Sequence, residues 1–184
     1  MLKKSPKKAL PSKRLSPKVL TPQKPKGHAF FFWTLFVLGL ILDQVTKMVV
    51  KNIHHTEALP YKVTHFLNIV YVENKGVSFG FFKDVLPFQK LLLLFLTIGI
   101  IIFLIFWFIK ESDRMHKMGI AFVITGAFGN IIDRLRYGAV IDFLDFHYAG
   151  LHFPAFNVAD ALISCGAMLM IARTLVPKKK FLDN

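Results

Sequence analysis

The sequence predicts a mainly α-helical integral membrane protein. Four transmembrane helices are expected, with a small extracytoplasmic β-rich platform between the first and second helices and a short extracytoplasmic segment between the third and fourth. Hydrophobic residues make up 54% of the 184-residue chain, and 20 residues are phenylalanine. Apolar runs long enough to cross a bilayer recur along the chain. Basic residues flank these runs and give a net charge of +13.

Residues 1–28 are predicted to form a basic, disordered cytoplasmic tail. They contain nine lysine or arginine residues and no acidic residue, together with several prolines and serines. Such a segment cannot bury enough apolar surface to fold. It is suited to anionic membrane lipid, because each basic residue near a charged surface contributes about 1 kcal/mol. Since the charges flank membrane spans, no nucleic-acid partner is expected.

Residues 29–177 are predicted to form one four-helix domain. Its four membrane spans are expected at residues 30–50, 91–109, 118–137 and 156–176. The second span carries no charge, and the first is too long for a secretory signal and has no small-residue cleavage site after it. The loop at 110–117 is mildly basic, and the tail at 178–184 begins with three lysines. Both termini are therefore expected in the cytoplasm.

The platform is expected within residues 51–90, on the outer membrane face. Phe66–Glu73 has the composition of a strand, Asn74-Lys75-Gly76 that of a turn, and Val77–Phe82 that of a second short strand. Exposed phenylalanines of this segment would enter the membrane interface, as aromatic residues often do.

The connection between the third and fourth spans supports the same orientation. Residues 138–156 contain no lysine or arginine, as expected for an outer segment. Arg134 and Arg136, at the outer end of the third span, oppose this orientation, although Asp133 can offset one of them.

On this topology five aspartates lie toward the outer leaflet: Asp43, Asp133, Asp142, Asp145 and Asp160. An ionised carboxylate at bilayer depth costs about 2.5–3.5 kcal/mol, so this gathering indicates a functional site. Two carboxylates in contact hold a single proton between them. The ionised member can take a proton from an attacking water while the other protonates a carbonyl oxygen. Spacing alone does not choose the pair from the five.

Four segments of the chain form an ordered series of motifs: ILDQVTK from Ile41, YVENKGVSFGFF from Tyr71, GNIIDRLRYGAVIDF from Gly129 and FNVADALI from Phe156. In this order and spacing the chain resembles the lipoprotein signal peptidases, also called signal peptidase II or peptidase family A8. The resemblance extends from about residue 30 to residue 176.

The resemblance implies that Asp142 and Asp160 are the catalytic pair. It also implies supporting or substrate-binding roles for Asp43, Lys47, Asn74, Gly76, Asn130, Asp133, Arg134 and Asn157. The expected activity is that of an intramembrane aspartic endopeptidase without metal or other cofactor. It would remove signal peptides from bacterial prolipoproteins, just before a diacylglyceryl-modified cysteine, in the cytoplasmic (inner) membrane. Cyclic peptide antibiotics are expected as inhibitors, membrane lipid as a partner, and a monomer as the oligomeric state.

Physical roles can be predicted for several of these residues. Lys47 lies four residues after Asp43 on one helix face and is expected to pair with it. Arg134 is expected to pair with Asp133. The side chains of Asn130 and Asn157 can bond a substrate backbone or a dyad oxygen, or can join helices to one another. Glycines at 119, 126 and 129 are expected to allow close helix approach.

Three other hypotheses remain open at this point. Asp142, Asp145, His147 and His152 carry ligand types that suit zinc or another divalent ion, although no HExxH helical pair occurs. The intramembrane acids could serve a small transporter or proton relay, although no inverted repeat is visible. They could also satisfy one another in a purely structural subunit.

Overall fold

The computed structural model describes residues 28–56, 59–76 and 87–176. The elements in chain order are α1 (His28–Thr56), β1 (Tyr61–Lys62), β2 (Leu67–Asn74), α2 (Pro87–Lys110), α3 (Arg114–Tyr137), β3 (Val140–Tyr148), β4 (Leu151–His152) and α4 (Val158–Leu175). The four helices are each long and apolar enough to cross a membrane, and a small antiparallel sheet accompanies them. The predicted fold class is confirmed. The predicted tails and the strand expected at residues 77–82 lie outside the described residues.

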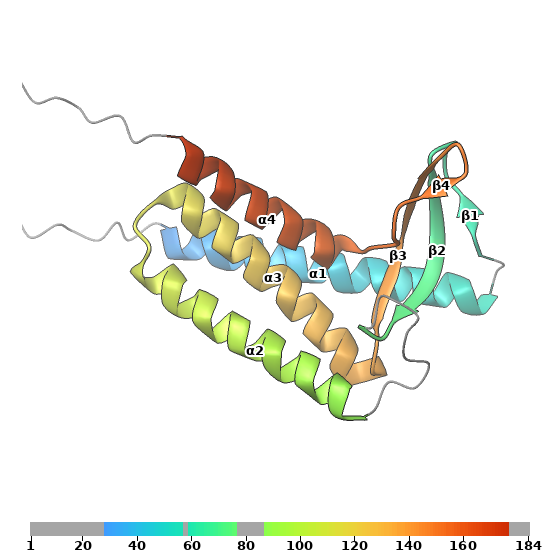
Figure 1. Cartoon of the computed structure of the whole chain (residues 1–184), viewed down its shortest axis with the longest axis horizontal. Helices are drawn as coiled ribbons and strands as arrows, with labels where there is room; N and C mark the ends of the chain where they lie inside the picture. Colours follow the sequence, from blue (N-terminus) through green and yellow to red (C-terminus); the bar gives the residue numbers. More distant parts are fainter. Residues whose placement is uncertain (1–27, 57–58, 77–86, 177–184) are drawn as a thin grey trace, which may run out of the picture.

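Helix α3 is the centre of the bundle, and α1, α2 and α4 all pack against it (Figure 1). Buried residues make up 56% of its most apolar window, against 11% for each of the other helices. The sheet lies at one end of the bundle, which we call the sheet end (Figure 1). We call the opposite end the loop end. Helix α1 begins there, α2 connects to α3 there, and α4 ends there (Figure 1). Helix α3 is therefore the element that contacts all three other helices and also β3.

The close contact between α3 and α4 depends on glycine, as predicted. A Cβ atom at Gly126 would meet the carbonyl oxygen of Ala159, and one at Gly119 would lie 2.7 Å from the carbonyl oxygen of Gly166. On the other side of α3, a Cβ at Gly129 would meet the Asp43 carboxylate of α1. Small residues let helix backbones approach closely where lipid offers no hydrophobic driving force.

The sheet is antiparallel in the order β1-β2-β3-β4. Strand β2 confirms the strand predicted at residues 66–73. Its long partner β3, however, comes from the connection between α3 and α4, so residues 51–90 supply only part of the platform. The C-cap Gly138, with φ of +71°, ends α3 in the left-handed conformation and turns the chain directly into β3.

Several helix boundaries differ from those expected. Helices α2 and α3 begin at Pro87 and Arg114, four residues before the expected starts at 91 and 118. Helix α1 continues to Thr56, so residues 51–56 extend the helix and do not belong to the platform. Helix α4 begins only at Val158, because the side chain of Asn157 accepts a hydrogen bond from the Asp160 N–H and caps the helix there.

We predict that Gly126→Ala destabilises the protein by about 1–3 kcal/mol, because the added methyl group meets backbone that cannot move independently. The measurement is the thermal unfolding midpoint in detergent. Gly99→Ala is the matched control, since no atom lies within 4 Å of the position of its Cβ. Equal midpoints for the two variants would contradict the close approach of α3 and α4.

Candidate active site

Asp142 lies on β3 at the sheet end and is only 2% exposed. Its Oδ2 accepts a 3.0 Å hydrogen bond from the Asn74 side-chain amide of β2. The other end of that amide is fixed, because Asn74 Oδ1 accepts the Gly76 N–H at 2.9 Å. Gly76 has φ of +84°, a conformation that favours glycine. The predicted turn therefore holds Asn74 as a hydrogen-bond donor to Asp142.

Asp160 lies in the first turn of α4 and is half-buried. Its Oδ1 accepts a 2.8 Å hydrogen bond from the Asn130 side-chain amide of α3. Its Oδ2 accepts the backbone N–H of Asn157 at 3.3 Å, and the Asn157 Oδ1 accepts the Asp160 N–H at 2.9 Å. This reciprocal capping box fixes the Asp160 side chain at the start of the helix.

Asn157 brings the two carboxylates together. It is fully buried, and its Nδ2 donates to Asp142 Oδ1 at 2.7 Å while its backbone N–H bonds Asp160. The amide orientation follows from the cap, since Oδ1 must face the Asp160 N–H and Nδ2 is left to face Asp142. Asp142 and Asp160 therefore share one buried asparagine, whereas Asp43 and Asp133 share Lys47 and Gln44.

The surroundings of Asp142 favour proton uptake. The pKa of its carboxyl is raised to about 6, mainly by burial and further by the charge of Asp160. The amide hydrogen bonds from Asn74 and Asn157 act in the opposite direction, because they stabilise the ionised form. The net result is a carboxyl with a pKa of about 6, above the usual value for aspartate.

A buried lysine holds the elements around the site. Lys47 on α1 is 2% exposed, and its Nζ lies 2.9 Å from Asp43 and 2.9 Å from Asp133 on α3. The predicted Asp43–Lys47 pair is confirmed. Lys47 also donates to Asn130 Oδ1 at 3.1 Å. Because an ammonium group can only donate, the Asn130 oxygen faces Lys47 and its Nδ2 faces Asp160.

The two acids beside Lys47 also hold the backbone next to Asp142 and Asp160, the pair that we call the dyad. Asp43 Oδ1 accepts the N–H of Ala159 at 2.8 Å, and Asp133 Oδ2 accepts the N–H of Ile141 at 3.2 Å. Ala159 and Ile141 immediately precede the two dyad aspartates in the chain. Helix α1 and helix α3 thus fix the backbone positions from which the dyad side chains extend.

Gln44 belongs to this cluster and was not predicted. Its Nε2 lies 3.1 Å from Asp43 Oδ2, 3.1 Å from Asp133 Oδ1 and 3.2 Å from the carbonyl oxygen of Gly129. It bridges the two acids through the Asp43 oxygen that also contacts Lys47 and through the Asp133 oxygen that does not. The motif ILDQVTK contains Gln44, but a neutral amide beside an ion pair carries no charge pattern that would single it out.

The predicted pair between Arg134 and Asp133 is wrong. In the described part of the chain Asp133 pairs with Lys47, while half-buried Arg134 lines a hollow of about 210 Å³ together with Asn74 and Leu93. Successive residues on a helix point about 100° apart, so Asp133 and Arg134 cannot both face the same neighbour. The hollow lies beside the residue that bonds Asp142.

The other candidate acid on β3 has separate partners. Asp145 lies 2.8 Å from His152 and accepts the Asn68 side-chain amide at 3.1 Å. Burial alone would raise the pKa of Asp145, but these hydrogen bonds outweigh it and hold the pKa below its usual value. His147 stacks on His152. Within the described residues, no group of three or more histidine, cysteine or acidic side chains is placed to hold a metal ion.

Comparison with known proteins gives a consistent result. Residues 35–176 match the family model of signal peptidase (SPase) II. The chain is 40% identical to a lipoprotein signal peptidase of Shewanella piezotolerans, over 86% of this chain and 94% of the relative. It is 39% identical to one of Clostridium tetani, over 74% and 87% of the two chains. Two solved structures of bacterial membrane enzymes superpose on the chain. One has a TM-score of 0.70 at 32% identity and covers 81% of this chain and 95% of its own. The other has a TM-score of 0.67 at 33% identity and covers 79% of this chain and 88% of its own.

We predict that Lys47→Met destabilises the protein by about 3–5 kcal/mol, because it leaves two buried carboxylates without their cation. Thermal unfolding in detergent measures the effect. Adding Asp133→Asn to Lys47→Met should recover part of the loss. Lys51→Met, one turn further along α1, is the control, since Lys51 only covers the Tyr137 ring and is expected to contribute about 0.5–1 kcal/mol. A Lys47→Met protein as stable as the unmodified one would contradict the role given to the buried cluster.

Proposed function

The chain belongs to the signal peptidase II family of membrane proteases, and from this premise we propose that it is an intramembrane aspartic endopeptidase. Its proposed substrates are bacterial prolipoproteins, which it cuts just before the diacylglyceryl-modified cysteine to release the signal peptide. Asp142 and Asp160 are the proposed catalytic residues. The observation that carries the proposal is the contact of both carboxylates with the single buried residue Asn157.

The proposed reaction needs one proton on the pair. The ionised carboxylate takes a proton from water as the water oxygen bonds to the scissile carbonyl carbon, and the protonated member gives its proton to the carbonyl oxygen. When the tetrahedral intermediate collapses, the C–N bond breaks and the leaving nitrogen takes up a proton from the pair. The raised pKa of Asp142, about 6, supports proton retention to a higher pH than an ordinary aspartate allows. The titration belongs to the pair and not to one member of it.

The supporting residues are proposed to position the pair and the substrate. Asn74, Asn130 and Asn157 donate to the carboxylates without bringing a positive charge into contact with them. Arg134 lines the hollow beside Asn74 and is placed to bind a substrate carbonyl or headgroup oxygen. Gly76 fixes Asn74, and the cluster of Asp43, Lys47 and Asp133 holds the backbone on which the dyad stands.

We also propose how this multi-pass membrane protein is placed. Both termini would lie in the cytoplasm and the sheet end at the outer face of the bacterial inner membrane. The basic residues before α1 and after α4, and the absence of lysine and arginine from residues 138–156, support this orientation. A monomer is sufficient, since the described chain supplies all the residues of the proposed site. Membrane lipid is the expected surrounding partner, and cyclic peptide antibiotics that occupy the dyad are expected inhibitors.

Asp142→Asn and Asp160→Asn are each expected to abolish cleavage of a diacylglyceryl-modified prolipoprotein by the purified protein in detergent. Either change removes a group that must carry or accept a proton, while the shape of the side chain is kept. The matched control is Asp145→Asn on the same strand, whose carboxylate bonds His152 and Asn68 instead. It should retain most activity. Substantial cleavage by either dyad variant, folded as judged by thermal unfolding, would overturn the proposed mechanism.

The pH dependence of kcat/KM is expected to follow the pair. Because the pKa of Asp142 is raised to about 6, the proton needed for catalysis is lost as pH rises through this value, and kcat/KM should fall above it. Asn74→Ala removes a hydrogen bond to the ionised carboxylate, so the descending limb should move upward by roughly half to one pH unit. Asn68→Ala, which removes the corresponding bond to Asp145, should leave the profile in place. A downward shift for Asn74→Ala would contradict the assignment.

A further inference from the structure

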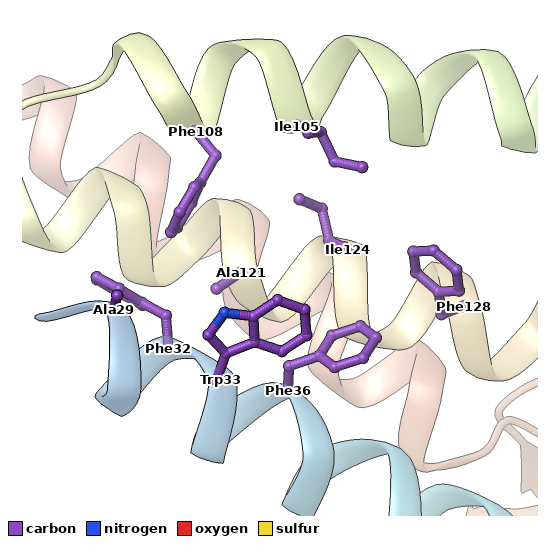
Figure 2. A pocket seen from close by; sticks show the side chains of 9 residues that line it. All are labelled: Ala29, Phe32, Trp33, Phe36, Ile105, Phe108, Ala121, Ile124 and Phe128. Atoms are coloured by element: carbon purple, nitrogen blue, oxygen red, sulfur yellow. The ribbon is translucent and has the colours of Figure 1, made fainter.

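An apolar groove lies at the loop end of the bundle, away from the dyad. It has a volume of about 370 Å³, within the range of small-molecule sites, and its walls come from α1, α2 and α3. Figure 2 shows the side chains that face it, which are Ala29, Phe32, Trp33, Phe36, Ile105, Phe108, Ala121, Ile124 and Phe128. All are apolar or aromatic. Trp33 is 67% exposed and stands at the opening.

The shape of the groove follows from the helix arrangement. Helices α1 and α2 both pack on α3, which forms the floor between them (Figure 2). Two edge-to-face aromatic pairs bracket the space. Phe32 and Phe108 meet across α1 and α2 with ring centroids 5.1 Å apart, and Phe36 meets Phe128 of α3 at 5.5 Å. Rings in such contacts lose freedom to move into the groove, so it is a built feature of the bundle.

Two cations of the first turn of α3 stand beside the groove. Lys117 lies 5.2 Å from the ring centroid of Phe108, a groove residue, and Arg114 lies 5.6 Å from that of Phe31. A cation–π contact leaves the positive charge unneutralised. No carboxylate lies within 4.0 Å of either cation in the described part of the chain.

The two nearby acids are occupied elsewhere. Asp113 pairs with Arg173 of α4 at 2.8 Å and caps α3. Glu111 accepts hydrogen bonds from the Trp107 ring and from the backbone N–H groups of Ser112 and Asp113. The cations beside the groove are therefore available to an external anion.

We propose that this groove binds an anionic phospholipid, with an acyl chain along its aromatic walls and the phosphate beside Arg114 and Lys117. An apolar channel next to two free cations matches a ligand with one long apolar part and one anionic part. The basic residues that precede α1 carry the same sign of charge as the two cations, so their charge is not complementary to this site. The site lies at the opposite end of the bundle from Asp142 and goes beyond the proposed peptidase activity.

Trp33 provides a direct probe of the groove. The chain contains two tryptophans, so Trp107→Phe leaves Trp33 as the one fluorophore of this kind. The full-length Trp107→Phe protein is placed in two series of phosphatidylcholine vesicles. One series contains increasing fractions of phosphatidylglycerol with brominated acyl chains. The other contains increasing fractions of phosphatidylcholine with brominated acyl chains. Quenching of Trp33 then gives the relative association constant of the two lipids. We expect a preference for phosphatidylglycerol of at least about five-fold.

Arg114→Gln with Lys117→Gln, in the same background, should reduce the preference to about one-fold while quenching by brominated phosphatidylcholine continues. Lys110→Gln is the control. It removes one exposed positive charge from the same end of the bundle without a contact to the groove rings, and it should keep the preference.

Equal quenching by both lipids before mutation would overturn the proposal, as would an unchanged preference in the double variant. Absence of quenching by either lipid would indicate a second protein copy on the groove and would also overturn it. Prolipoprotein cleavage by the double variant should persist, which separates this test from that of the peptidase.

Discussion

The whole site depends on one buried ammonium group. Lys47 lies between Asp43 and Asp133, and these acids also hold the backbone N–H groups just before Asp142 and Asp160. Asp43 does so through its other oxygen, and Asp133 through the same oxygen that contacts Lys47. A buried ion pair adds little net stability over apolar packing, because desolvation offsets the attraction. Its contribution here is geometric. It joins α1 to α3 and, through backbone hydrogen bonds, to the starts of β3 and α4.

The dyad receives its hydrogen bonds from asparagine and not from a cation. Each of Asn74, Asn130 and Asn157 has its oxygen fixed by a group that can only donate, namely a backbone N–H or Lys47. The amide nitrogens are consequently directed at the carboxylates. A lysine in direct contact would lower the carboxyl pKa strongly, whereas a neutral donor lowers it less. The arrangement orients both acids while leaving the pair able to keep a proton.

Composition and spacing predicted the spans, the strand that became β2 and the pair of Asp43 with Lys47, because each depends on residues close in the chain. They did not predict the pairing of β2 with β3, since the partners lie about 70 residues apart and no local pattern encodes which strand meets which. Likewise, the pairing of Lys47 with Asp133 depends on how α1 lies on α3. The choice of Asp142 and Asp160 came from the resemblance. The structure gives a physical reason for leaving out Asp145, because its carboxylate bonds His152 and Asn68.

An irregularity in the pairing of β2 with β3 also decides which side chains meet at the site. Below Ile69 the register pairs Asn68 with Asp145, and beyond it Val72 pairs with Asp142, so one additional residue of β2 is inserted between them. Paired residues point to the same face, and a shift of one residue moves a side chain to the opposite face. Without this bulge Asp142 would lie opposite Tyr71 and point away from the face that carries Asn74. The irregularity in β2 is therefore what allows Asn74 to meet Asp142, and a straight ladder would separate the carboxyl from the amides that orient it.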